Sequence, residues 1–158
     1  MYYIHMNKEK NTEKPREAGL YAVVSKGGSS ETVAEPIATY MVRRIREGLP
    51  IDELQALCEL LECSEDALAK WLGISKATLH RRKKAGFLDS SESERVVRAV
   101  RLFARAEDVL DSKSAAREWL KSPARALGGE SPLDYTDTEV GAREVENLLG
   151  RIEHGVFS

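Results

Sequence analysis

Apolar residues recur three and four positions apart along most of the chain, which is the spacing that places them on one face of an α-helix. The pattern is regular from residue 31 onward, and short stretches rich in glycine, proline and serine interrupt it. We expect helices over residues 31–46, 51–61, 65–72, 76–84, 92–109, 112–121 and 137–154. No internal repeat is present in the sequence. The chain therefore reads as an all-α protein.

Residues that cap helices support several of these boundaries. Ser64 and Ser75 stand immediately before the third and fourth helices, where a serine side chain accepts a hydrogen bond from a free backbone N–H. Thr136 and Glu139 have the spacing of a capping box, so we expect Thr136 to cap the last helix. Gly73 follows the third helix and suits the left-handed conformation in which helices often end.

The first 30 residues lack this regular pattern. Lysine, glutamate, asparagine and threonine dominate their first half, and residues 26–30 read as a flexible linker. Leu20–Val24 fits a short β-strand, but a single short strand is not stable alone. We therefore expect a weakly ordered segment over 1–30, a helical domain over 31–110 and a second, smaller helical domain over 111–158.

Composition narrows the classes of protein to which this chain can belong. It has 158 residues, a formal net charge of -2 and 42% hydrophobic residues, which is ordinary for a globular protein. No apolar run reaches the ~18 residues of a membrane-spanning helix, and no secretory signal is recognisable. The cysteines, Cys58 and Cys63, read as reduced, packed thiols, and the histidines lie far apart. We expect a cytoplasmic protein that binds no membrane, no metal and no cofactor.

The small net charge hides an asymmetry between two parts of the chain. Residues 74–88 contain five basic side chains and no acid, whereas residues 130–158 contain seven acids and two arginines. The basic stretch suits a polyanion, and the acidic stretch suits a different partner. The alternative is two ordinary solvated helix faces.

Residues 65–86 form the strongest motif in the sequence. They read as a helix, a turn centred on Gly73 and a second helix, with the small residue Ala69 four positions before the turn glycine. Apolar residues fall where the two helices must pack. This is the pattern of a helix-turn-helix, whose second helix enters the major groove of DNA with its N-terminus first. The alternative is a helical hairpin that does not touch DNA.

Docking of this kind assigns roles to the polar side chains of the second helix. Arg81 suits a bidentate contact with guanine, and Lys76 suits either that contact or a phosphate. Ser75 suits a phosphate at the helix N-terminus. The expected DNA-binding residues are Ser75, Lys76, Ala77, His80, Arg81, Lys83 and Lys84. Arg82 stands where such motifs often bury an apolar residue, and it would either pair with an acid or reach the DNA backbone.

A single helix-turn-helix contacts only a few base pairs, so specific binding normally uses two copies on a two-fold operator. We therefore expect a homodimer and assign both dimerisation and DNA binding to residues 31–110. The helices before Ser64 and the long helix over 96–109 are the candidates for the dimer interface.

The C-terminal third carries a second set of motifs. These are the sequences at 116–120, 123–129, 132–133, 137–139, 141–142 and 145–158. Further upstream, Gly48-Leu49-Pro50, the helix from Thr78 to Arg82 and the segment 92–95 belong to the same set. Together they span residues 42–158, about three quarters of the chain. The combination resembles the Xre/MbcA/ParS antitoxins of RES–Xre type II toxin–antitoxin systems.

This resemblance implies an Xre-like helix-turn-helix domain followed by a small helical toxin-binding domain. The implied partner is a RES-domain toxin encoded by a neighbouring gene, an enzyme that degrades NAD. The antitoxin would cover the entrance of the toxin's active site with its C-terminal region. It would also bind its own promoter as a repressor, with the toxin modulating repression.

The end of the chain has features that suit such a block. Val156 and Phe157 would form a small apolar plug after a turn at Gly155, while Glu146 and Glu153 would occupy a basic dinucleotide pocket together with the terminal carboxylate. The expected toxin-binding residues are Trp119, Arg125, Leu148, Arg151, Ile152, Glu153, His154, Gly155, Val156 and Phe157. For the tryptophan and the two aliphatic helix residues the alternative is core packing, and for the last four residues a frayed terminus.

Two other functions compete with this one. A stand-alone helix-turn-helix transcriptional regulator would have no toxin gene beside it and would form no stable complex with another protein. An enzyme would need a catalytic set of side chains, a glycine-rich phosphate loop after a strand or a metal site, and the sequence contains no motif for any of them. We therefore expect no catalysis.

Overall fold

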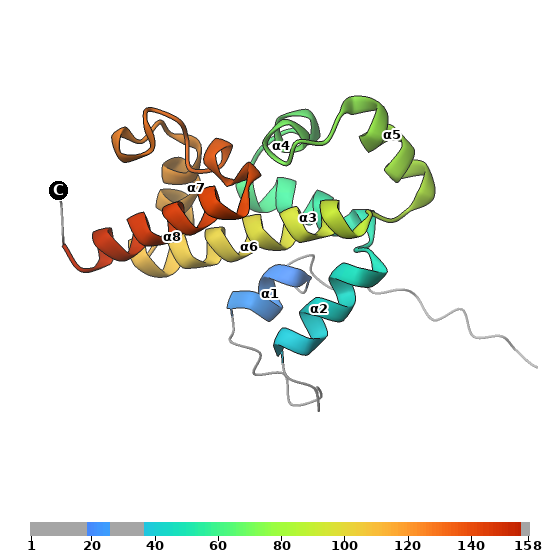
Figure 1. Ribbon diagram of the computed structural model, residues 1–158, viewed down its shortest axis with the longest axis horizontal. Helices are drawn as coiled ribbons and strands as arrows, with labels where there is room; N and C mark the ends of the chain where they lie inside the picture. Colours follow the sequence, from blue (N-terminus) through green and yellow to red (C-terminus); the bar gives the residue numbers. More distant parts are fainter. Residues whose placement is uncertain (1–18, 26–36, 156–158) are drawn as a thin grey trace, which may run out of the picture.

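The computed structural model of the chain describes residues 19–25 and 37–155. Within these ranges the chain is helical and contains no β-strand, which confirms the expectation of an all-α protein. The α-helices and the two 3-10 helices (η) follow one another along the chain, and Figure 1 labels the α-helices. They are α1 (Leu20–Ser25), α2 (Ile37–Glu47), α3 (Ile51–Leu61), α4 (Glu65–Trp71), α5 (Lys76–Ala85), α6 (Ser90–Leu110), α7 (Lys113–Lys121), η2 (Arg125–Leu127), η3 (Asp134–Asp137) and α8 (Glu139–Glu153). None of the described helices is long and apolar enough to cross a bilayer.

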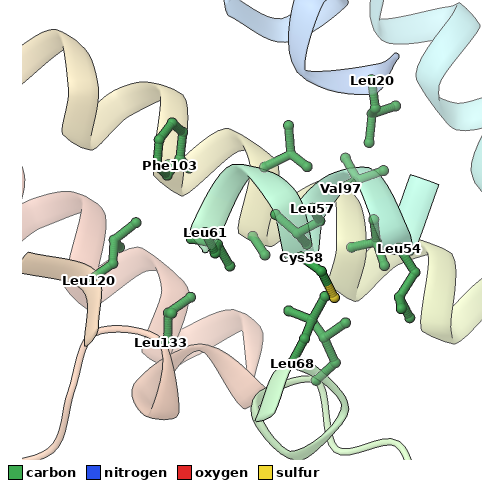
Figure 2. Packing of buried hydrophobic residues seen from close by; sticks show 14 of the residues in the cluster. Leu20, Leu54, Leu57, Cys58, Leu61, Leu68, Val97, Phe103, Leu120 and Leu133 are labelled. Carbon is green, nitrogen blue, oxygen red and sulfur yellow. The ribbon is translucent and has the colours of Figure 1, made fainter. Parts of the chain in front are cut away.

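The long helix α6 forms the centre of the molecule. The helices α1, α2, α3, α7 and α8 all pack against it (Figure 1). Val97 and Phe103 of α6 are buried in a core that also takes Leu54 and Leu61 from α3 (Figure 2). Burying one such side chain stabilises a fold by about 1.5–3 kcal/mol, so this core holds the N-terminal helices and the C-terminal helices to one element.

A second, smaller cluster joins α6 to α8. It consists of Leu102, Leu127, Ala142 and Val145. Trp119 of α7 packs against both this cluster and the main core. The C-terminal part of the chain is therefore built onto α6 through apolar packing of its own.

Residues 20–25 form the helix α1, so the short strand considered for Leu20–Val24 is not formed. The described part of the chain offers no partner strand, and Leu20 is buried against the core. The Leu20 N–H donates to Oε2 of Glu53 at 3.1 Å, and the Tyr21 ring meets the Phe103 ring edge-on with centroids 5.7 Å apart. Of the first 30 residues, the structure describes 19–25, and these form one helix packed on the core.

The ends of the predicted helices agree with the structure to within a few residues. Ser64 and Ser75 cap α4 and α5 as expected, since their hydroxyls accept hydrogen bonds from the N–H groups of Ala67 and Thr78 at 3.2 Å and 3.1 Å. The helix predicted from residue 31 is described from Ile37 onward, and its earlier residues lie outside the described ranges.

The cap of the last helix is Thr138, so the assignment of Thr136 as the cap is wrong. The Thr138 hydroxyl accepts from the Gly141 N–H at 3.1 Å. Thr136 is buried in η3, and its hydroxyl donates instead to the carbonyl of Leu133 at 2.9 Å. η3 lies so close to the start of α8 that a Cβ on Gly141 would be 1.8 Å from the Tyr135 carbonyl oxygen. A glycine at this position is what lets the two elements approach.

Candidate nucleic-acid interface and C-terminal surface

The turn between α4 and α5 is a helix end of the Schellman type. The Ile74 N–H donates to the Ala69 carbonyl at 2.8 Å, and the Gly73 N–H donates to the Lys70 carbonyl at 3.1 Å. Gly73 has a φ of 63°, the left-handed conformation predicted from the sequence. Arg95 of α6 donates from Nη1 to the Leu72 carbonyl at 2.8 Å and thereby fixes the turn to the central helix.

The helix α5 places its polar side chains in solvent, as a recognition helix requires. Leu79 is buried and anchors α5 to the core, whereas Ala77, His80, Arg81 and Lys84 are exposed. Among the described residues, Arg81 and Lys84 have no ion-pair partner. These two cations are therefore available for phosphate or base contacts without first breaking a contact of their own.

Two of the predicted DNA-binding lysines are ion-paired with acids in the first turn of α4. Lys76 Nζ lies 2.9 Å from Asp66 Oδ2, and Lys83 contacts Glu65. The Lys76–Asp66 pair is largely exposed, and such pairs are worth only about 0–1 kcal/mol. Phosphate can replace either acid at small cost, so these pairs adjust the affinity for DNA without excluding it.

The Ser75 hydroxyl is occupied within the helix. It accepts from the Thr78 N–H at 3.1 Å and its own hydrogen is donated to Thr78 Oγ1 at 2.9 Å. The direct phosphate contact expected for Ser75 would have to displace the second of these bonds. The unpaired backbone N–H groups of the first turn remain the more accessible donors to a phosphate.

Arg82 is the partner of the capping box that begins α6. Asp89 and Glu92 exchange hydrogen bonds between side chain and backbone, at 2.8 Å and 2.9 Å. The Arg82 guanidinium contacts both carboxylates, with Nε 2.7 Å from Glu92 Oε2 and Nη2 2.5 Å from Asp89 Oδ2. Of the two alternatives for this side chain, the pairing with acids is the one observed.

The charges of this cluster stabilise one another. The hydrogen bond to Glu92 raises the pKa of Arg82. The pKa of Asp89 is lowered, first by the hydrogen bond from the Glu92 N–H and then by the neighbouring Arg82 charge. Glu92 is only 5% exposed, so its carboxylate depends on these partners. The recognition helix is thus attached to α6 by a half-buried ionic cluster.

The helix α8 lies along α6, and acids on α8 meet arginines on α6. Arg98 Nε is 3.4 Å from Glu139 Oε2, and Arg101 Nη2 is 3.5 Å from Glu146 Oε1. A third pair, Arg105 with Glu153, closes the series near the end of α8. The face of α6 that carries these three arginines is therefore the face that α8 covers.

These ion pairs neutralise acids near the end of α8 that were expected to be free. The hydrogen bond from Arg105 holds the pKa of Glu153 below its usual value. Glu146 and Glu153 are therefore not the free negative charges that the sequence suggested, because each is paired within the chain. Arg151, one of the expected toxin-binding residues, is paired with Glu144 at 3.3 Å.

The other predicted toxin-binding residues fall into three groups. Trp119 and Leu148 are half-buried against the second apolar cluster, which favours the core-packing alternative for both. Arg125 is exposed at the start of η2 and has no ion-pair partner among the described residues. Ile152 is half-buried, and His154 and Gly155 are exposed, with Gly155 at a φ of 66°. Val156 and Phe157 lie outside the described residues.

Among the described residues, the large apolar side chains of Val42, Phe87 and Val140 are exposed, and none of them was predicted as a site residue. Val140 in the first turn of α8 is 79% exposed, beside a groove that runs between η3 and α8. Phe87, directly after the recognition helix, is 57% exposed. Val140 does not fall on the helical spacing of the buried apolar residues of α8. This position in the sequence was the available indication that its side chain would be exposed.

The two candidate surfaces lie at different ends of the molecule. Figure 1 shows α5 beside the N-terminal end of α6, while α8 runs away from α5 toward the opposite end. The described part of the C-terminal region therefore does not cover the recognition helix. These features define a helix-turn-helix DNA-binding protein with an additional helical domain that leaves a second surface open.

Comparison with known proteins identifies both parts. Residues 41–101 match the antitoxin Xre-like helix-turn-helix domain, and residues 105–155 match the C-terminal toxin-binding domain of the Xre/MbcA/ParS antitoxins. An Antitoxin Xre of Yersinia enterocolitica is 35% identical over 122 residues, which cover 76% of this chain and 82% of that protein. The chain belongs to the Xre/MbcA/ParS antitoxin family, and the two matches meet within α6.

Two further relatives agree with this assignment. An Antitoxin Xre of Photorhabdus laumondii is 35% identical over 116 residues, covering 72% of this chain and 78% of that protein. A Prs ADP-ribosylating antitoxin of a Sphingobium species is 29% identical over 126 residues, covering 72% of this chain and 78% of that protein. The chain is therefore an antitoxin whose two domains imply two partners, DNA and a toxin.

Proposed function

We propose that this antitoxin neutralises a RES-domain toxin that degrades NAD, by covering the entrance of the toxin's active site, and that it represses its own promoter. The observation that carries the proposal is the separation of the two surfaces along α6. A protein that must hold DNA and a toxin needs two faces that do not compete for the same space. The open face of α8 and the exposed cations of α5 meet this requirement.

DNA binding is assigned to the exposed side of α5. Arg81 reads a base and Lys84 binds a phosphate, while Lys76 and Lys83 exchange their α4 acids for phosphates. His80 and Ala77 face the same groove, and the first-turn N–H groups next to Ser75 bind a phosphate. A homodimer places two such helices on a two-fold operator, as specific recognition by this motif normally requires.

Toxin binding is assigned to the end of α8 and the residues around it. Arg125 offers an exposed cation, and Ile152, His154 and Gly155 lead toward the chain end. Val156 and Phe157 then supply an apolar plug. Because Glu153 is held by Arg105, it contributes no free negative charge to a basic pocket of the toxin.

The test is coexpression with the product of the adjacent open reading frame. We expect the two proteins to copurify, the partner alone to lower cellular NAD and arrest growth, and the complex to leave NAD unchanged. The complex should also bind a fragment of its own promoter. A neighbouring gene whose product neither depletes NAD nor copurifies would reject the RES assignment and favour a stand-alone regulator.

A further inference from the structure

The chain has two cysteines, and the fold brings them together at the end of α3. Glu62 adopts the left-handed conformation with a φ of 50°. Its N–H donates to the Glu59 carbonyl at 3.2 Å, and the Cys63 N–H donates to the Cys58 carbonyl at 3.0 Å. This is a Schellman motif, in which the side chains of the two residues joined by the longer bond meet. Here both of these residues are cysteines.

The closed turn places the two cysteines at positions that a disulfide could join. A disulfide needs Cα atoms about 4.4–6.8 Å apart and side chains that point toward each other. The Cys63 N–H donates to the Cys58 carbonyl at 3.0 Å, and this backbone bond brings the two cysteines together across the end of α3. Joining the sulfurs therefore requires rotation of side chains and little movement of the backbone.

The two thiols have different environments. Cys58 is 7% exposed and lies among the leucines of α3 and α4 (Figure 2), and the hydrogen bond with Cys63 and burial both raise the pKa of its thiol. Cys63 is half-buried, and the hydrogen bond from Cys58 and the charge of Lys121 lower the pKa of its thiol. Lys121 is held in place because its Nζ donates to the Leu61 carbonyl at 3.0 Å.

We propose that Cys58 and Cys63 form an oxidisable dithiol that hydrogen peroxide converts into an intramolecular disulfide at the start of the helix-turn-helix. Cys63, the more accessible residue, reacts first. Its thiolate attacks one oxygen of the peroxide, the O–O bond breaks, and a sulfenic acid and hydroxide form. The Cys58 sulfur then attacks the Cys63 sulfur, and the hydroxyl group leaves as water after taking up the Cys58 proton. In total, two thiols lose two electrons and two protons, and the peroxide becomes two water molecules.

The two cysteines lie directly before the helix-turn-helix, so a bond between them can alter the packing of that motif. Ser64, which caps α4, follows Cys63 directly, and Leu68 of α4 shares the buried cluster with Cys58. A bond to Cys63 draws the Cys58 sulfur away from this cluster. We therefore expect the oxidised protein to bind operator DNA more weakly than the reduced protein, while the C-terminal surface is unaffected.

The experiment uses the full-length protein, reduced and then freed of reductant. It is treated with hydrogen peroxide, denatured, alkylated with iodoacetamide and weighed by intact-mass spectrometry. We expect the loss of both alkylation sites and a mass lower by two hydrogen atoms, both reversed by dithiothreitol. Since these are the only two cysteines in the sequence, the result assigns the bond without peptide mapping.

Two variants make the result decisive. Cys58→Ala should stop at the sulfenic acid of Cys63, which dimedone traps, whereas Cys63→Ala should react with peroxide much more slowly. The proposal is overturned if the wild-type protein keeps both alkylation sites at a peroxide dose that oxidises Cys63 in the Cys58→Ala variant. A sulfinic acid on Cys63 in the wild-type protein, or a disulfide between two chains, would overturn it as well.

Discussion

Arg82 of the recognition helix binds Glu92 in the first turn of α6, with Nε 2.7 Å from Oε2. Because Glu92 is also half of the capping box that starts α6, the contact connects the DNA-binding helix to the element that carries the C-terminal domain. The Arg82 guanidinium therefore helps to fix the orientation of α5, together with the buried Leu79 side chain. Its removal should affect stability and DNA binding together.

Replacement of Arg82 by methionine tests this contact. Methionine keeps most of the length of the side chain but leaves the Glu92 carboxylate buried without its cation, which is unfavourable. We expect a lower Tm in thermal unfolding followed by circular dichroism, and weaker operator binding. Lys84→Met is the matched control, since Lys84 is exposed on the same helix: it should weaken DNA binding and leave the Tm unchanged. A wild-type Tm for the Arg82 variant would contradict the anchoring role.

The lowered pKa of Asp89 predicts a pH-dependent contribution to stability. A carboxylate whose pKa is lower in the folded state stabilises the fold above its ordinary pKa of about 3.9, and this contribution disappears as the pH falls through the folded value. Asp89→Asn keeps a capping side chain but has no charge. The difference in free energy of unfolding between the wild type and this variant should be largest near neutral pH and should fall toward zero as the pH becomes acidic.

Urea titrations at a series of pH values measure that difference. Asp89→Ala, which removes the cap as well as the charge, should cost about 0.5–2 kcal/mol of stability at every pH at which the protein folds. If the gap between wild type and Asp89→Asn has the same size at neutral and acidic pH, the Asp89 charge does not stabilise the fold.

Asp66 competes with DNA for Lys76, so its removal should strengthen binding. In Asp66→Asn the lysine loses a partner 2.9 Å away and the surface facing the phosphates loses a negative charge. Since an exposed pair is worth at most about 1 kcal/mol, the gain in affinity should not exceed about fivefold. It should appear on operator and on unrelated DNA alike, because a phosphate contact reads no sequence. Fluorescence anisotropy measures both, with Glu118→Gln on α7 as the control.

Arg81 and Lys84 should differ in the kind of binding energy they supply. If Arg81 pairs with guanine, Arg81→Ala should cost about 1–3 kcal/mol on the operator and relax preference at one base. Lys84→Ala should weaken all sequences similarly and reduce the slope of log K against log salt by about 1. Neither variant should change neutralisation of the toxin. A loss of neutralisation in Arg81→Ala would show that the two functions are not carried by separate surfaces.

The local features of this fold were readable from the sequence, and the long-range ones were not. The caps at Ser64 and Ser75 follow from hydrogen bonds within three residues, and the turn at Gly73 follows from its conformational freedom. The partner of Arg82 was undetermined, because it depends on how α6 leaves the motif.

The expectations that the structure did not bear out also depended on contacts between distant parts of the chain. A six-residue apolar segment such as Leu20–Ser25 fits a strand or a helix, and the presence of α6 and the absence of a described partner strand decide between them. The last helix begins two residues later than predicted because Thr136 is used by η3. The acids of α8 looked free in the sequence because nothing local indicates that the arginines of α6 lie opposite them.

Deletion of Val156–Ser158 tests the assignment of the chain end to the toxin. Because Glu153 is bound to Arg105 and Gly155 closes the helix with a hydrogen bond to Ile152 at 3.1 Å, α8 should remain intact in the truncated protein. We expect promoter binding and Tm to stay at wild-type values while protection from the toxin, measured by growth and cellular NAD, decreases. A variant with Val156→Ser and Phe157→Ser separates the apolar side chains from the length of the chain, since it keeps all of the residues after α8. Loss of protection in both proteins assigns the effect to the apolar side chains, and loss in the truncation alone assigns it to the remaining groups of residues 156–158. If the truncated protein protects cells fully, the chain end does not enter the toxin, and the exposed face around Val140 becomes the surface to mutate next.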